Sequence, residues 1–260
     1  MLIRENYLAK IRPIIGKDII KILTGSRRAG KTTLLKQIRD EINSPNTIVL
    51  NFEDLGNRHL CECNALHEYV CKQIGDSKEQ FYLFFDEIQE VQGWETAVNS
   101  LRVKFHADIY ITGSNSKLLS GELATYIAGR YVSFVVYPFS YAEFKTVSAD
   151  YTFEDYIQHG GMPFLTSIDF DSEIGKNYLR DIFNSVVLKD IVKRNSINVR
   201  DVDLLERIIA YALSNVGRSF SATSISKEGL IKSTCMDWRA NFHAPRGKKS
   251  QEYLVYFKIF

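Results

Sequence analysis

Residues 19–36 predict a strand, a glycine-rich loop and a helix in direct succession. The apolar run Ile19 to Leu23 has the length and the branched side chains of a buried strand. The pattern Gly25-x-x-x-x-Gly30-Lys31-Thr32 follows it, and leucines at helical spacing continue to about residue 43. In this strand–loop–helix context the pattern is typical of a phosphate-binding loop.

The sequence of this loop predicts a binding site for the phosphates of a nucleoside triphosphate. Its two glycines let the backbone turn tightly and aim successive N–H groups inward, and the start of the helix adds a positive dipole end. We expect Lys31 to reach the β- and γ-phosphates of ATP and the Thr32 hydroxyl to bind Mg²⁺. The alternative is an ordinary glycine turn. The predicted nucleotide-binding residues are Gly25, Ser26, Arg27, Arg28, Ala29, Gly30, Lys31, Thr32 and Thr33.

A second apolar run ends in two carboxylates. Phe81 to Phe85 suits a strand buried on both faces, and Asp86 and Glu87 follow it directly. In a phosphate-loop domain a carboxylate at this place holds Mg²⁺, which favours Asp86 as a metal ligand beside Thr32. We expect Glu87 to orient and polarise the attacking water. Two solvated acids in a turn are the alternative, and the phosphate loop makes that alternative the weaker one.

Two further positions are candidates for the catalytic site beside Lys31 and Glu87. The predicted strand 108–112 ends in small polar residues, of which Ser114 or Asn115 is expected to sense the γ-phosphate. The alternative role there is a helix N-cap. Arg130 ends a predicted helix. It is either a finger that neutralises charge on the nucleotide of a neighbouring subunit, in a homo-oligomer, or a surface arginine favoured by the helix dipole.

The order of the predicted elements indicates an α/β fold. Five apolar strands alternate with helices over residues 1–145, which is typical of a parallel sheet with helices on both faces. One of these predicted helices spans residues 58–75, with its apolar side chains on one side. Lys31, Asp86 and Ser114 all fall at carboxyl ends of strands, where ligands bind in such sheets. Later in the chain, helical spacing predominates. The predicted helices there are 153–159, 173–194 and 201–216.

Composition and charge exclude several classes. The chain has 33 basic and 31 acidic residues among 260, so its net charge of +2 shows no strong bias toward nucleic acid or membranes. The sequence has neither a run of 18 apolar residues nor a secretory leader, and we expect a cytoplasmic protein without membrane contact. The four cysteines lack partners at metal-site spacing, so free thiols are expected.

Three domains are predicted, and the last is the least regular. Residues 1–145 form the nucleotide-binding domain, and residues 146–226 a smaller helical lid or winged-helix-like extension. Residues 227–260 hold seven Lys or Arg against three Asp or Glu, without helical or strand periodicity. Such a basic tail favours either a contact with DNA or the end of a chain cut short.

The motifs as a set resemble the prokaryotic AAA-type ATPases that carry an uncharacterised C-terminal domain. The resemblance covers roughly residues 1–226. It implies an ATPase fold with Lys31 and Thr32 in the first motif and Asp86 and Glu87 in the second, followed by a helical or winged-helix extension. Family members usually continue into a nuclease-like domain, which this chain lacks, so we expect a C-terminally truncated member. The segments that carry the resemblance are residues 25–32, 51–54, 84–89, 111–131, 160–163 and 178–194.

The sequence therefore predicts an ATP-binding protein that hydrolyses ATP with Mg²⁺ and drives a conformational switch. Two alternatives come from other classes. One is a nucleotide-gated DNA-binding module in which residues 200–260 contact DNA. The other is a phosphotransferase that gives the phosphate to a small molecule, for which residues 116–150 lack the expected arginine-rich lid.

Overall fold

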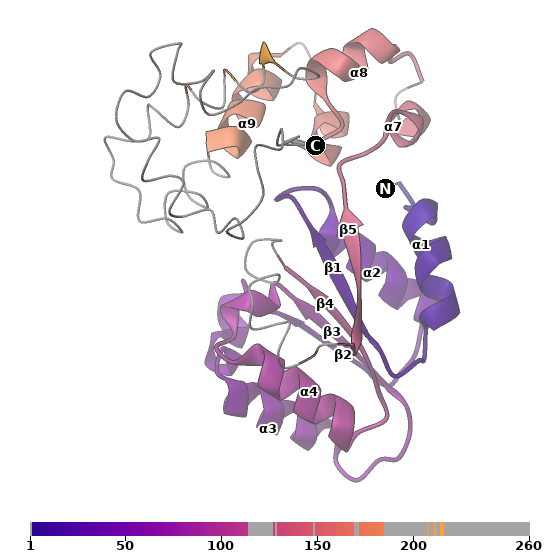
Figure 1. Ribbon diagram of the computed structural model, residues 1–260, viewed down its shortest axis with the longest axis vertical. Coiled ribbons are helices and arrows are strands. Elements are labelled where there is room, and N and C mark those ends of the chain that lie inside the picture. Colours follow the sequence, from indigo (N-terminus) through magenta and orange to yellow (C-terminus); the bar gives the residue numbers. More distant parts are fainter. Residues whose placement is uncertain are drawn as a thin grey trace, which may run out of the picture. The chain divides into compact units, whose positions relative to one another are not determined.

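The fold is built on a parallel sheet of five strands in the order β2-β3-β4-β1-β5 (Figure 1). The computed structural model describes residues 2–113, 127, 129–147, 149–168, 172–184, 207, 211, 214 and 215. Every residue of β1 and β4 is buried, which explains why most of their side chains are apolar. The predicted five-stranded α/β fold is confirmed. The strands are β1 (Ile20–Gly25), β2 (Thr47–Asn51), β3 (Phe81–Asp86), β4 (Ala107–Thr112) and β5 (Tyr131–Val136).

Helices cover both faces of the sheet and bury two apolar cores. On one face, α3 (Cys63–Ile74) and α4 (Trp94–Lys104) pack on the strands, as Figure 1 shows. On the other face lie α1 (Glu5–Ile11) and α2 (Lys31–Ile42), whose leucines and isoleucines contact side chains of the central strands. This three-layer arrangement leaves the carboxyl ends of the strands available for a ligand. The remaining helices are η1 (Arg12–Ile14), η2 (Leu55–Leu60), η3 (Ile88–Glu90), α7 (Tyr141–Val147), α8 (Phe153–His159), η4 (Pro163–Ser167) and α9 (Glu173–Asn184).

The segment predicted as one helix over residues 58–75 is in fact two. The 3₁₀ helix η2 is capped by Asp54, whose carboxylate accepts the N–H of Gly56 at 2.9 Å, and α3 begins only after Glu62. Glu62 forms an isolated bridge with Gln92, so the chain between the two helices is held extended. This pairing with a distant segment overrides the local helical spacing.

The chain divides into two compact units, with the boundary between Tyr178 and Leu179. Of the predicted later helices, 153–159 is confirmed as α8, and α9 accounts for the first part of 173–194. The rest of that segment, almost all of 201–216 and the tail 227–260 lie outside the described residues. The winged helix and the three domain boundaries therefore stay predictions. Over the described part of the chain, every helix is too short or too polar to cross a bilayer.

A buried ion pair joins two central strands near their amino ends. Lys21 on β1 donates to Asp108 on β4, and both side chains are fully buried. The Asp108 carboxylate also accepts the hydroxyl of Tyr110 and the N–H of Gly16, and Lys21 donates to the carbonyl of Lys17 at 2.9 Å. Each charge is thus met by several hydrogen bonds, the condition under which a buried pair is tolerated.

Candidate functional site

The predicted phosphate loop connects β1 to α2 at the carboxyl edge of the sheet. At its start Gly25 has a φ of 146°, and a Cβ built there would lie 2.1 Å from the carbonyl oxygen of Val136 on β5. Only glycine fits, because both the backbone angle and the approach of β5 exclude a side chain. Arg28 and Gly30 also have positive φ values, 64° and 93°, so the loop reverses twice within a few residues.

The start of α2 has the features of an anion site. Gly30 is its N-cap, and no side chain caps the free N–H groups of the first turn, which includes Thr32 and Thr33. The hydroxyl of Ser26 is buried in the loop without a hydrogen-bond partner. A buried orphan hydroxyl beside uncapped N–H donors fits a ligand with many acceptor oxygens, such as a polyphosphate. Arg27 and Arg28 are exposed on the same loop.

Lys31 lies folded into the loop. Its side chain is only 6% exposed and its Nζ donates to the carbonyls of Gly25 and Ser26, at 3.3 and 3.1 Å. Burial lowers the pKa of Lys31, and the nearby carboxylates of Glu87 and Asp86 offset this only in part. The nearby carboxylates therefore do not fully compensate the buried positive charge of Lys31, and the phosphates of a nucleotide would supply further negative charge.

The structure brings the two predicted metal ligands together. The hydroxyl of Thr32, on α2, donates to Oδ1 of Asp86, at the end of β3, over 3.2 Å. The two residues are 54 positions apart in the chain. Asp86 is only 3% exposed. A hydroxyl and a carboxylate side by side next to a polyphosphate site are oxygen ligands of the kind that Mg²⁺ takes, so the residues present fit the ion.

Two residues that the sequence analysis did not select hold Asp86 in place. Thr112, the last residue of β4, donates to Oδ1 of Asp86, and Asn51, the last residue of β2, donates to Oδ2 at 3.3 Å. The neighbouring strands thus supply one polar side chain each to the same carboxylate. Both could have been found in the sequence, because Asn51 and Thr112 are polar residues at the carboxyl end of an apolar strand.

Glu87 follows Asp86 in a left-handed conformation, with a φ of 54°. Its backbone N–H donates to the Thr112 hydroxyl at 3.0 Å, and its carboxylate accepts a hydrogen bond from the side chain of Gln89. A left-handed non-glycine residue is strained, and here the contact with Thr112 helps to hold it. Glu87 lies close enough to Lys31 to influence its pKa, so the predicted base belongs to the same site.

The other two catalytic candidates have different outcomes. Ser114 and Asn115 lie outside the described residues, and the sensing role stays a prediction. Arg130 lies at the amino end of β5, where its carbonyl accepts the N–H of Ile20 and its guanidinium donates to Asn99 on α4 at 3.2 Å. The six residue steps from Arg130 to Val136 place Arg130 roughly 20 Å from the loop edge of its own sheet. It does not join this chain's site, and a role toward a neighbouring subunit stays a prediction.

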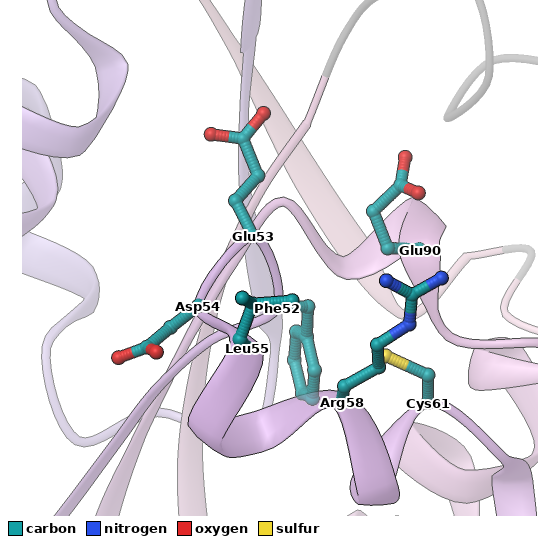
Figure 2. A pocket seen from close by; sticks show the side chains of 7 residues that line it. All are labelled: Phe52, Glu53, Asp54, Leu55, Arg58, Cys61 and Glu90. Atoms are coloured by element: carbon teal, nitrogen blue, oxygen red, sulfur yellow. The ribbon is translucent and has the colours of Figure 1, made fainter.

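A polar cavity of about 680 Å³ opens beside the end of β2. Figure 2 shows the guanidinium of Arg58 beneath the carboxylate of Glu90, with the Asp54 side chain turned away. The cavity adjoins the acidic site, because the N–H of Phe52 donates to the carbonyl of Asp86 at 3.1 Å. Its lining residues are Phe52, Glu53, Asp54, Leu55, Arg58, Cys61 and Glu90.

Three of the four cysteines lie among the described residues, and Cys61 lines this cavity. Cys61, Cys63 and Cys71 are free thiols that are partly buried. Burial is the main cause that raises the pKa of the Cys61 thiol. Within the described residues, no three His, Cys, Asp or Glu side chains are grouped so that they could hold a metal ion.

Comparison with known families agrees with this geometry. Residues 17–145, which include the five described strands and all the described site residues, match the family model of the AAA domain. The chain is an AAA-domain protein. The AAA domain belongs to the P-loop ATPases, so the family predicted from the motifs is confirmed, and nucleotide binding is implied. Residues 150–240 match a domain of unknown function, DUF8612.

Two curated relatives share both parts of the AAA-domain chain. An uncharacterized protein of Haemophilus influenzae is 38% identical over 239 residues, which are 87% of this chain and 59% of that protein. The uncharacterized protein MJ1544 of Methanocaldococcus jannaschii is 34% identical over 234 residues, 80% of this chain and 52% of its own length. The chain thus spans about half the length of the curated relatives it matches.

A solved structure shows the same fold. The Walker-type ATPase PABY2304 of Pyrococcus abyssi superposes with a TM-score of 0.58, covering 93% of this chain and 88% of that one. Only 15% of the residues are identical, so the likeness concerns the fold alone.

Proposed function

We propose that the AAA domain binds ATP with Mg²⁺ and hydrolyses it, and that the hydrolysis cycle drives a conformational switch. The contact between Thr32 and Asp86 carries this proposal. It joins the phosphate loop to the acidic end of β3 at 3.2 Å, next to a desolvated lysine. The combination of polyphosphate donors, metal-type oxygens and a neighbouring carboxylate supports phosphoryl chemistry better than nucleotide binding alone.

Each residue has a defined role in the proposed reaction. The N–H groups of the loop and the ammonium of Lys31 bind the phosphates and offset their charge. Thr32 and Asp86 would hold Mg²⁺, which adds positive charge at the β- and γ-phosphates when it is bound. Glu87 accepts a proton from the attacking water and orients it. Ser114 or Asn115 senses the γ-phosphate, and Arg130 completes the site of a neighbouring subunit in a homo-oligomer.

Glu87→Gln tests the hydrolytic role directly. The substitution keeps the size of the side chain but removes the base, so binding of Mg-ATP should remain while turnover falls by about 10² or more. Glu68→Gln, on the exposed face of α3, is the matched control and should turn over ATP like the parent. Release of phosphate and the binding constant are measured on the same samples. Parent-like turnover by Glu87→Gln would show that another group acts as the base.

The same assay separates the alternatives from other classes. A phosphotransferase consumes ATP only when an acceptor is added, so turnover in buffer alone argues for hydrolysis. For DNA binding, almost all of residues 200–260, which are proposed to contact the duplex, lie outside the described part of the chain. Binding of duplex DNA that weakens with salt would support that function, and its absence at low salt would remove it.

A further inference from the structure

A buried arginine near the amino terminus contacts a main-chain carbonyl of the phosphate loop. Arg4 is 2% exposed, and its Nη1 donates to the carbonyl of Ala29 at 3.3 Å, inside the loop between Arg28 and Gly30. Neither the sequence motifs nor the proposed reaction uses this residue. Its main chain is tied to the loop helix as well, because the N–H of Arg4 donates to Gln37 of α2 at 3.1 Å.

The same guanidinium holds the segment that leaves β5. It donates to both carboxylate oxygens of Glu143, at 2.8 and 3.2 Å, and to the carbonyl of Tyr137 at 2.9 Å. The rings of Tyr7 and Phe139 lie against it, with centroids 4.7 and 5.1 Å from its central carbon. A guanidinium is a rigid planar fork, so its contacts to the loop and to Glu143 cannot adjust independently.

Glu143 is in turn built into the start of α7. Its carboxylate accepts the N–H and the hydroxyl of Ser140, at 2.9 and 3.0 Å, and Ser140 accepts the N–H of Glu143 in return. A movement of this helix start therefore moves the carboxylate that Arg4 binds.

The Ala29 carbonyl matters because the same peptide group carries the N–H of Gly30. In a trans peptide the carbonyl and the following N–H point in opposite directions. Arg4 fixes the carbonyl of Ala29 behind the loop, so the N–H of Gly30 is fixed in the opposite direction, away from Arg4. Holding one peptide plane in this way pre-organises a donor of the phosphate loop without touching the nucleotide.

A second contact links the same segment to the loop. A Cβ built on Gly30 would meet Cγ of Pro163 at 3.8 Å, so the first residue of η4 lies close to the loop. The turn just before η4 is tied back to the start of the segment, because the N–H of Phe139 donates to the carbonyl of Gly161 at 2.7 Å. The segment from Tyr137 to Pro163 therefore reaches the loop at two neighbouring residues, through Arg4 and through Pro163.

We propose that Arg4 is a positioning residue of the nucleotide site, which orients the Ala29–Gly30 peptide and, through Glu143, couples the phosphate loop to the segment Tyr137–Val147. The proposal rests on the proposed binding of ATP. The coupling through Arg4 goes beyond ATP binding, because it specifies how a change in the loop reaches the part of the chain that follows the AAA domain. That coupling is the physical requirement for a conformational switch.

Substitutions of the pair test the proposal through nucleotide affinity. Arg4→Met removes the charge and fork, and Glu143→Gln removes the charge with little change of shape. Each should weaken binding of the non-hydrolysable analogue Mg-AMPPNP by about tenfold, and Arg4→Lys by less, since it keeps the charge. The double variant should be no weaker than the worse single one, because the residues act as one unit. Arg12→Met, in an exposed ion pair with Glu41, is the control and should bind like the parent.

The outcomes separate the two proposals. Folded Arg4 and Glu143 variants that bind the analogue like the parent would overturn the positioning role and leave ATP binding intact. Failure of the parent itself to bind would overturn both. Purely additive losses in the double variant would contradict a shared unit.

Hydrogen exchange on the parent chain avoids the risk that a variant fails to fold. Adding Mg-AMPPNP should slow exchange in the loop and in residues 137–147, while α3, which packs on the other face of the sheet from α2, changes less. Protection confined to the loop would overturn the coupling.

Discussion

Thr112 donates a hydrogen bond to the carboxylate of Asp86 from the adjacent strand. The same hydroxyl accepts the N–H of Glu87 at 3.0 Å, so a single side chain at the end of β4 holds both Asp86, the last residue of β3, and Glu87, which follows it. Thr112 therefore sets how the metal ligand and the proposed base lie relative to each other.

Thr112→Val should lower ATP turnover more than it lowers stability. Valine keeps the shape of threonine but removes the hydroxyl, which takes one hydrogen bond from Asp86 and leaves the N–H of Glu87 without this acceptor. We expect the turnover rate to fall by about tenfold or more, from the loss of one or two hydrogen bonds at the site. Thr47→Val is the matched control, because that hydroxyl bonds the Ser44 carbonyl at the opposite edge of the sheet. Equal turnover by the two variants would refute the role of Thr112.

Nucleotide affinity should fall at alkaline pH because of Lys31. Burial, the largest cause, lowers the pKa of the free site below the ordinary 10.5, and bound phosphates would raise it again. Binding is therefore at full strength below the pKa of the free lysine and weakens above it, by up to about tenfold per pH unit. Calorimetry in two buffers with different ionisation heats should show proton uptake on binding. Lys36→Ala, on the exposed face of α2, should behave like the parent, and an affinity independent of alkaline pH would contradict the prediction.

Glu143 should contribute to acid unfolding. Burial alone would raise its pKa, but hydrogen bonds from Ser140 and Arg4 outweigh this and hold the pKa below the ordinary 4.5. A carboxylate with a lowered pKa in the folded state stabilises the protein above its ordinary pKa, and this contribution is lost as pH falls through the lowered value. Urea unfolding from pH 7 to pH 3 should thus show a shallower acid loss for Glu143→Gln than for the parent. Identical slopes would be inconsistent with the contact between Glu143 and Arg4.

Asp108→Asn should destabilise the fold without reaching the nucleotide site directly. The substitution leaves Lys21 as a buried charge without its anion, which typically costs about 3 kcal/mol in the free energy of unfolding. Asp18→Asn is the control, because Asp18 pairs with Arg102 at the surface and is 70% exposed; we expect a loss below about 1 kcal/mol there. Similar denaturant midpoints for the two variants would show that the buried pair does not stabilise the protein.

Local patterns accounted for much of the fold and for the core of the site. The five strands follow from apolar runs, and α2 from its leucine spacing, because period and length are properties of neighbouring residues. The closeness of Thr32 to Asp86 was predictable, because the loop before α2 follows β1, Asp86 ends β3, and parallel strands bring their carboxyl ends to one edge. The prediction failed where a distant segment intervened, as at Glu62, whose pairing with Gln92 splits the expected helix.

What the sequence determined alone is the loop: two glycines, a lysine and a threonine at fixed spacing restrict the backbone wherever the chain folds. Only the tertiary structure decided which side chains surround the loop and the carboxylates beside it. β4 lies between β1 and β3, which brings Thr112 to Asp86, and Arg4 meets Glu143 across 139 positions of the chain. The physical reason is that backbone restrictions act between neighbours in sequence, whereas these contacts depend on strand order and packing.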